Sequence, residues 1–354
     1  MRCGSISAGV TCILLGFLAA GRAGVIRHDV NDAVYTSLAA QSVYDSVGFL
    51  TWEVTSDEGT SGYIASGTLI SPEWVLTAGH VVGGTDDYGA GVSGMIFGLG
   101  SVLSETGIAA TGVIPYAGWS SSGGNLWNGV DLGLVRLSEP ITNVTPALLD
   151  FRTPLLGLVG TNVGYGRSGI GSGGMSTPAG TKRAGQNMID ARGGMVTKRE
   201  GGTLLELDLR GISPTVLFQD FDNPTDLVAS SIGSAIPVAQ EYLIANGDSG
   251  GGLFIDVGGV TKLVGVNSFL ASLPYPWDTT GAKADYGDLA GVVSVQSFEN
   301  WIFTVTGVPE PSVVSLLFFG LGGLVLMRRR FVNSSRVWMW VKPESRDSAD
   351  MEGS

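Results

Sequence analysis

Residues 246–252 read Asn-Gly-Asp-Ser-Gly-Gly-Gly, which sets a serine among glycines with an aspartate directly before it. Glycine adopts backbone angles that side chains forbid, so such a segment can turn sharply and expose the hydroxyl of Ser249. The same freedom lets backbone N–H groups point at a reacting oxygen, as the oxyanion created by serine attack requires. Because the chain has 55 glycines, the segment could equally be a glycine turn with an incidental serine, and the upstream residues have to decide.

A serine hydroxyl is a weak nucleophile and needs a neighbouring base, for which histidine is suited because its pKa lies near neutrality. The chain contains two histidines, His28 and His80. His80 ends the motif Leu-Thr-Ala-Gly-His at residues 76–80, whereas His28 lies near the expected mature N-terminus and has no comparable setting. His80 is therefore the predicted general base.

A carboxylate that could orient this histidine stands at Asp131. It belongs to Val-Asp-Leu-Gly-Leu-Val-Arg-Leu at residues 130–137, a largely apolar run in which an acidic side chain is costly unless it is paired. A buried carboxylate fixes the tautomer of a catalytic imidazole and stabilises its protonated form. Each residue alone has a simpler explanation, since His80 could be a core histidine and Asp131 a strand-start cap, so the hypothesis depends on the three motifs together.

These motifs, in the chain order histidine, aspartate, serine, resemble the trypsin-like serine protease family with the chymotrypsin fold. The resemblance covers roughly residues 45–303. It implies an all-β domain of two six-stranded antiparallel β-barrels with a C-terminal helix, and a site in the cleft between the barrels. It also implies catalytic roles: Ser249 as nucleophile, His80 as general base and acid, Asp131 as orienting acid, and the N–H groups of Gly247 and Ser249 as oxyanion hole.

The resemblance further indicates residues that bind substrate. Asn-Ser-Phe at residues 267–269 is similar to the substrate-binding edge of the family. This places Ser268 near Asp131, and it places Phe269 and Leu270 beside the substrate.

The preference for the residue before the cleaved bond is expected to depend on the floor of the specificity pocket. Counting six residues back from Ser249 puts that floor at Leu243. A pocket for lysine or arginine needs a carboxylate there, so leucine predicts a small or medium apolar residue at this position of the substrate. Glu241 lies two residues away, and a shifted alignment would reverse the expectation.

Asp248 is expected to support the site structurally. In many members of the family its counterpart pairs with a new N-terminal amine that zymogen cleavage releases. No Ile-Val-Gly-Gly stands upstream of His80, and Val-Ile-Arg-His-Asp at residues 25–29 is only a loose analogue. Two alternatives follow: signal removal leaves the enzyme directly active, or another group pairs Asp248.

The composition is that of a globular and acidic protein. Of 354 residues, 44% are apolar and 15% are charged, and the formal net charge is −12. Nucleic-acid binding needs clustered lysine and arginine, so this balance argues against it. Residues from about 167 to 235 are expected to carry an insertion relative to the family, which could be a substrate lid, a metal-binding loop or neither. The acidic run at 220–224 within it suggests calcium only weakly, so we expect no cofactor and no metal site.

Short apolar or alternating runs, separated by glycine-rich turns, predict strands at residues 47–54, 63–70, 74–76, 132–137 and 263–266. At residues 295–305, apolar side chains recur at helical spacing and predict a helix that packs on the core. This pattern by itself favours an all-β barrel or sandwich.

Residues 1–23 have the features of a secretory signal peptide. A positively charged start precedes an apolar run at residues 10–20 and small residues before the cleavage point. Both cysteines, Cys3 and Cys12, lie in this segment, so the mature protein would contain no disulfide. Residues 24–306 are then expected to form a protease domain outside the cytoplasm.

Residues 307–330 combine three features of a C-terminal sorting signal. Val-Pro-Glu-Pro at residues 308–311 is followed by an apolar segment and by three arginines at 328–330. The combination resembles the bacterial PEP-CTERM signal, which an exosortase-type membrane enzyme reads. The apolar segment would form a short transmembrane helix with the arginines on the cytoplasmic side. The tail at 331–354 departs from that family, and the alternative is an ordinary membrane anchor after a proline linker.

The sequence therefore predicts an exported serine endopeptidase that acts on protein or peptide substrates. It would reside at the cell envelope or outside the cell, with at least a transient membrane anchor. The alternative is a catalytically silent protein of the same fold that serves in surface adhesion or binding. A lipase or esterase would require the order serine, aspartate, histidine, whereas His80 precedes Ser249 here.

Overall fold

The computed structural model describes residues 24–56, 59–83, 94–198, 206–227, 230–272 and 283–307. The predicted signal peptide at 1–23, and the predicted sorting segment and tail from residue 308 onward, lie outside these residues. Within them, no helix is both long and apolar enough to cross a membrane. The strands all belong to one unit that ends at Trp301, and a second unit begins at Ile302.

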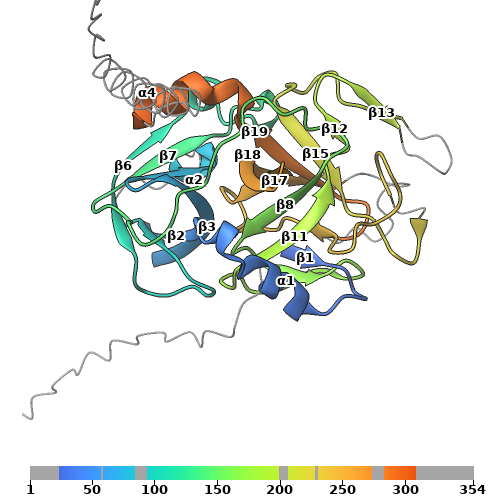
Figure 1. The fold of residues 1–354 in the computed structure, drawn as a ribbon, viewed down its shortest axis with the longest axis horizontal. Helices are drawn as coiled ribbons and strands as arrows, with labels where there is room; N and C mark the ends of the chain where they lie inside the picture. Colours follow the sequence, from blue (N-terminus) through green and yellow to red (C-terminus); the bar gives the residue numbers. More distant parts are fainter. Residues whose placement is uncertain are drawn as a thin grey trace, which may run out of the picture. The chain divides into compact units, whose positions relative to one another are not determined.

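Six strands in the first half of the chain close into a barrel, in the order β2-β3-β4-β7-β6-β5 (Figure 1). Their bounds are β2 Val47–Ser56, β3 Gly59–Ser71, β4 Trp74–Thr77, β5 Ile96–Gly98, β6 Ile108–Pro115 and β7 Gly133–Leu137. Neighbouring strands pair antiparallel. Apolar side chains such as Phe49, Leu69 and Leu76 are completely buried. The first half thus has the strand number and pairing that the sequence resemblance implied.

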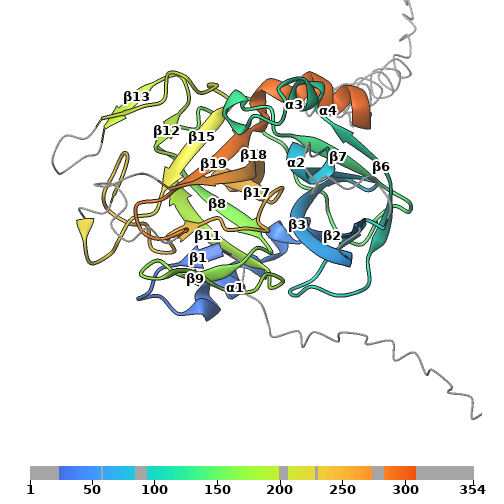
Figure 2. The same ribbon diagram turned by 180° about the vertical axis from the view of Figure 1, so that it is seen from behind.

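The second half forms a sheet of seven strands in the order β11-β8-β17-β18-β19-β15-β12, visible beside the barrel strands in Figure 2. Their bounds are β8 Val159–Gly164, β11 Arg183–Met188, β12 Ala191–Arg192, β15 Val216–Asp220, β17 Gly252–Val257, β18 Val260–Ala271 and β19 Leu289–Ser294. Only Ile189 and Asp190 separate β11 from β12, so the two outer strands are halves of one bent segment. The sequence resemblance implied a second closed barrel of six strands, and the structure shows this sheet of seven strands instead. Here a bend within one segment divides it into two strands at opposite ends of the sheet.

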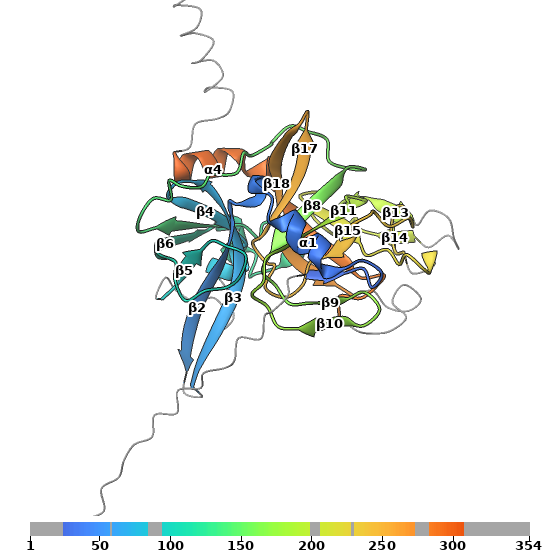
Figure 3. The same ribbon diagram turned by 60° about the horizontal axis from the view of Figure 1, so that its bottom comes forward.

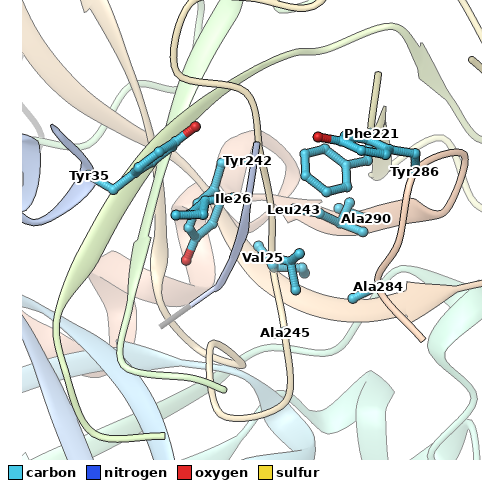
Figure 4. Packing of buried hydrophobic residues seen from close by; sticks show 11 residues of the cluster. Val25, Ile26, Tyr35, Phe221, Tyr242, Leu243, Ala245, Ala284, Tyr286 and Ala290 are labelled. Atoms are coloured by element: carbon cyan, nitrogen blue, oxygen red, sulfur yellow. The ribbon is translucent and has the colours of Figure 1, made fainter. Parts of the chain in front are cut away.

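A smaller sheet of four strands, in the order β10-β9-β1-β16, joins the N-terminal segment to the region that precedes Ser249. Its strands are β1 Gly24–Ile26, β9 Ser168–Ile170, β10 Gly174–Thr177 and β16 Tyr242–Leu243. β1 pairs antiparallel with β16 and parallel with β9. Figure 4 shows the apolar cluster around them, in which Val25 and Ile26 lie beside Tyr242 and Leu243. The start of the described chain is therefore part of the core.

The range expected to carry an insertion, residues 167–235, is mostly built into the sheets. It contains strands β9 to β12 and β15 of the two sheets just described. It also contains a separate two-stranded ladder of β13 Val196–Lys198 and β14 Glu206–Asp208. The range is therefore scaffold rather than one continuous loop.

The α-helices of the described chain are short: α1 Asp32–Ala39, α2 Gly79–Val82, α3 Ala117–Ser121 and α4 Glu299–Thr306. Helix α1 begins after Asn31, whose side chain accepts the N–H of Ala33. An ion pair of 2.6 Å between Asp32 and Arg183 joins α1 to β11, over which it lies in Figure 3. The helix predicted at residues 295–305 is confirmed, because a 3₁₀ turn, η4 Val295–Phe298, runs directly into α4.

Candidate active site

The carboxylate of Asp131 holds the imidazole of His80. His80 lies on α2, directly after β4, and Asp131 lies just before β7. Oδ1 of Asp131 accepts the backbone N–H of His80 at 2.7 Å, and Oδ2 lies 2.8 Å from Nδ1 of the ring. Because a carboxylate only accepts hydrogen bonds, this contact places the ring proton on Nδ1 and leaves the lone pair of Nε2 to act as a base. Asp131 is fully buried and His80 is partly exposed, so the ring is fixed on one side and accessible on the other.

A third donor completes the surroundings of Asp131. The hydroxyl of Ser268, on β18, donates to Oδ2 of Asp131 at 2.5 Å. Asp131 thus accepts three hydrogen bonds, from donors in both halves of the chain, which offsets the cost of burying its charge. The structure brings His80, Asp131 and Ser268 into direct contact.

The turn that carries Ser249 is held against both sheets. The carbonyl oxygen of Ser249 accepts the N–H of Ser66 on β3 at 2.8 Å, and the N–H of Gly250 donates to the carbonyl oxygen of Asn267 on β18 at 2.8 Å. Gly250 has a φ of +85°, and a Cβ there would lie 2.0 Å from Oγ1 of Thr77. Only glycine permits this approach. The turn therefore lies against β4, the strand that leads into the histidine-bearing helix α2.

Two backbone N–H groups of the turn remain available to a substrate. Gly247 has a φ of +99°, which turns the chain just before the serine. Among the described residues, neither the N–H of Gly247 nor that of Ser249 donates a hydrogen bond, whereas the intervening N–H of Asp248 donates to the carbonyl oxygen of Ala245 at 2.8 Å. Amide N–H groups free beside a hydroxyl are what the stabilisation of an oxyanion requires.

Asp248 lies behind the turn and is fully buried. Its Oδ1 accepts the N–H of Gly166 at 2.8 Å, and its Oδ2 accepts the N–H of Ala245 at 2.8 Å and the hydroxyl of Tyr242 at 3.2 Å. Burial raises the pKa of Asp248 to about 6, against the opposing effect of these hydrogen bonds. In the structure the partners of Asp248 are therefore residues within the chain and not an N-terminal amine.

A cavity of about 400 Å³ opens beside Ser249. Its lining combines apolar, uncharged polar and basic side chains: Ile244, Ala245, Asn246, Ser249, Ser268, Phe269, Leu270, Ser272 and Lys283. Phe269 and Leu270, which the resemblance placed beside the substrate, thus share a cavity with the predicted nucleophile. This cavity is the candidate specificity pocket.

The predicted floor of the pocket, Leu243, is not part of its lining. Leu243 is fully buried on β16, where it pairs with Val25 and packs into the apolar cluster of Figure 4. The next residue, Ile244, lines the cavity instead. Glu241, the alternative floor, is buried as well, and its carboxylate accepts the N–H of Val238 at 2.6 Å. Both expectations are corrected, because strand pairing with Val25 holds Leu243 in the core and Glu241 is buried against Val238, whereas the residues that line the cavity, 244–246, follow the end of β16.

A larger cavity of about 540 Å³ lies elsewhere, between α1, the end of β5 and the loop that follows β10. It is lined by residues such as Thr36, Leu99 and Lys182, and by none of the predicted site residues. Size alone would favour this cavity as a binding site. The smaller cavity is the better candidate for chemistry, because it contains Ser249 and the donor to Asp131, Ser268.

A second group of carboxyls comprises the buried Asp220 and Asp222 and the partly buried Asp190. Burial and the charge of Asp220 raise the pKa values of Asp190 and Asp222 to about 9. The acidic run at 220–224 suggested calcium weakly. In the part of the chain that the structure describes, however, no three His, Cys, Asp or Glu side chains are arranged to hold a metal ion.

Two residues near the site were missed by the sequence analysis. The ring of Trp119, on α3, lies with its centroid 6.3 Å from that of His80. Gly79 permits this packing, because a Cβ there would lie 2.9 Å from the indole of Trp119. Lys283 lines the candidate pocket. No motif marks Trp119 or Lys283, because neither stands at a fixed spacing from the residues that carry the resemblance.

Two comparisons with known proteins show what this chain is similar to. The family described as Trypsin matches residues 46–302, well over half of the chain. A solved structure described as HL collagenase covers 82% of this chain and 99% of its own, with 18% sequence identity and a TM-score of 0.49. The family match decides the assignment. This chain belongs to the trypsin family.

Proposed function

We propose that this protein is a serine endopeptidase in which Ser249 is the nucleophile, His80 the general base and acid, and Asp131 the orienting carboxylate. Membership of the trypsin family supports a serine-type peptidase that acts on peptide or protein substrates. The observation that carries the finer proposal is the 2.8 Å contact between Asp131 and Nδ1 of His80. The close approach of the Ser249 turn to β4 supports it further.

In the proposed reaction, Oγ of Ser249 attacks the carbonyl carbon of the scissile bond while Nε2 of His80 takes the hydroxyl proton. The carbonyl oxygen becomes an oxyanion, which the N–H groups of Gly247 and Ser249 stabilise. The C–N bond then breaks, His80 protonates the leaving amine, and the acyl group stays on Oγ. Water attacks this ester as Nε2 takes its proton, which releases the acid and restores both side chains.

A fluorophosphonate probe tests this proposal directly, because it reacts covalently with an activated serine. We expect the folded protein to be labelled, and we expect Ser249→Ala and His80→Ala to abolish the label. Ser272→Ala is the matched control, since it removes another hydroxyl from the same cavity and should leave labelling intact. Folded wild-type protein that fails to label would contradict the enzyme and leave the silent adhesion protein as the better explanation.

We also propose that removal of residues 1–23 suffices for activity, without a further cleavage. Asp248 already has its partners in Tyr242, Gly166 and Ala245, so the turn does not depend on a newly released amine. N-terminal sequencing of active protein checks this, and we expect a start at or near Gly24. An internal start well past Ile26 would contradict it.

Export and sorting remain part of the same proposal. The features of residues 1–23 and 307–330 support an exported protein at the cell envelope or outside the cell. An exosortase-type enzyme would read the C-terminal segment. Fractionation of cells that express the full chain, followed by mass determination of the C-terminus, checks it. Full-length protein found only in the cytoplasm would contradict this part and leave the catalytic proposal standing.

A further inference from the structure

The candidate pocket is where the side chain before the cleaved bond would lie, provided that Ser249 is the nucleophile as proposed. An acyl group on Oγ of Ser249 places its side chain in the adjoining cavity. Phe269 and Leu270 belong to β18 and form one wall, and Ala245 and Asn246 belong to the segment before Ser249 and form another. The chemistry of this lining therefore determines which residue the enzyme selects.

Lys283 is the one charged side chain among the described residues that line the pocket. The remaining lining residues are apolar or carry hydroxyl or amide groups. Lys283 is exposed, and it forms no ion pair with any residue that the structure describes. Its ammonium charge is thus available to a ligand in the cavity.

The backbone of Lys283 and of the residue that follows it is held in place. Its carbonyl oxygen accepts the N–H of Met175 at 3.1 Å. The next residue, Ala284, is fully buried, and its N–H donates to Oδ2 of Asp288 at 2.7 Å. Ala284 has a φ of +62°, a left-handed conformation that costs free energy in a residue with a Cβ and persists only when its surroundings enforce it. The backbone that carries Lys283 is therefore fixed on the side of Ala284, at a cost in backbone strain.

Two acidic residues lie near this segment but do not line the cavity. Asp285 and Asp288 are both completely buried. Oδ2 of Asp288 accepts the hydroxyl of Ser272 at 3.0 Å in addition to the N–H of Ala284. Neither carboxyl lines the cavity, so among the described residues the charge presented to it is that of Lys283.

The polar groups of the pocket also suit a carboxylate. The hydroxyl of Ser268 is engaged by Asp131 and that of Ser272 by Asp288, so neither is free to bind a cation. The amide of Asn246 is exposed and stands on the lining with Lys283, and its N–H groups can donate to an acid. A basic ligand would find a like charge and no described carboxylate in the lining.

We infer that the pocket selects aspartate or glutamate immediately before the cleaved bond, with Lys283 as the counter-charge that determines specificity. This inference rests on the proposed function and replaces the apolar preference expected from Leu243. The positive charge of Lys283 attracts an acidic side chain of the substrate and repels lysine or arginine, and both effects contribute to specificity.

Fluorogenic peptides that differ only at this position test the inference. We expect kcat/KM for glutamate or aspartate to be about tenfold higher than for leucine or alanine, and lysine and arginine to be the poorest. In Lys283→Gln the preference for acids should disappear, and in Lys283→Glu it should reverse in favour of lysine. Arg192→Gln is the matched control, because it removes an exposed cation on β12 away from the pocket and should leave the preference unchanged.

Labelling by the fluorophosphonate probe separates the possible failures. If wild type and both Lys283 variants label equally but show the same preference for apolar or basic residues, the inference is overturned and the proposed function stands. If wild-type protein does not label, the proposed function fails first. Raised salt provides a second measurement, since it should weaken the preference for acids in the wild type and leave Lys283→Gln unaffected.

Discussion

Asp131 and Asp222 are both buried carboxyls, yet their surroundings are opposite. Asp131 accepts three hydrogen bonds, from the backbone and ring of His80 and from the hydroxyl of Ser268. Asp222 lies beside the carboxyl of Asp220, and its Oδ1 meets no donor in the described part of the chain. Three donors therefore hold the carboxyl of Asp131 where it can orient a histidine, whereas burial and the charge of Asp220 raise the pKa of Asp222 to about 9.

The difference shows that burial alone does not make an acid functional. An ionised carboxyl inside a protein needs donors that offset the loss of water, and the proposed site supplies them from two sheets. In the second group three donors reach Asp220, whereas Oδ1 of Asp222 has none among the described residues. Carboxyls without enough donors stay protonated in the folded chain. Because they would lose the proton on unfolding, the stability of the fold depends on pH.

The largest expected effect comes from removing the charge of Asp131 without changing its shape. In Asp131→Asn the amide can turn a donor toward Nδ1 of His80, which favours the wrong tautomer. We expect kcat/KM to fall by about 10⁴-fold, with the fold intact by circular dichroism. Ser268→Ala keeps the carboxylate and should cost only about tenfold. An Asp131→Asn enzyme within tenfold of wild type would show that this carboxylate does not orient the base.

Substitution of Asp248 should have the next largest effect on activity, because its two carboxyl oxygens support the turn only by accepting hydrogen bonds. In Asp248→Asn one oxygen becomes a donor that faces the N–H of Gly166 or of Ala245. We expect a loss of about 10²-fold in kcat/KM and a destabilisation of roughly 1–3 kcal/mol in chemical unfolding. Tyr242→Phe removes only the 3.2 Å bond and should cost about 1 kcal/mol. Equal effects of the two variants would contradict the role assigned to the amide bonds.

The substitution Asp222→Asn should have the smallest effect on activity. It should increase the stability of the folded protein. Below a pH of about 4 the folded and unfolded chains both hold this proton, so Asp222→Asn and wild type should be similarly stable. As the pH rises toward 9, the unfolded chain releases the proton while the folded chain keeps it, so the stability of wild type falls. Asp222→Asn should therefore be more stable at neutral pH, by roughly 1–3 kcal/mol.

Urea unfolding of both proteins from pH 4 to 9 measures this difference, with the exposed Glu139→Gln as control. The expected signature is a gap that opens as the pH rises. The pKa values of the neighbouring Asp190 and Asp220, about 9 and about 6, also lie in this range, so Asp222→Asn should reduce the pH dependence of stability without abolishing it. A variant less stable than wild type at pH 7 would mean that Asp222 is ionised in the fold.

Local patterns predicted much of the fold. The strands expected at 47–54, 63–70, 74–76, 132–137 and 263–266 coincide with β2, β3, β4, β7 and β18. Alternation of apolar and polar side chains has a period that short segments reveal, and so does the helical spacing at 295–305. The seven-stranded sheet was not predictable in this way. Its ladders join segments far apart in the chain, and the bend at Ile189 and Asp190 carries no motif.

The sequence by itself determined the family and the candidates Ser249, His80 and Asp131, because their chemistry requires particular residue types within short recognisable motifs. Only the tertiary structure decided what lines the pocket. Leu243 pairs with Val25 on β16 and is buried in the core, whereas Ile244, just past the end of that strand, lines the cavity. Lys283 reached the same cavity from a distant segment that packing alone brought there, so no count along the chain could have placed its charge beside Ser249.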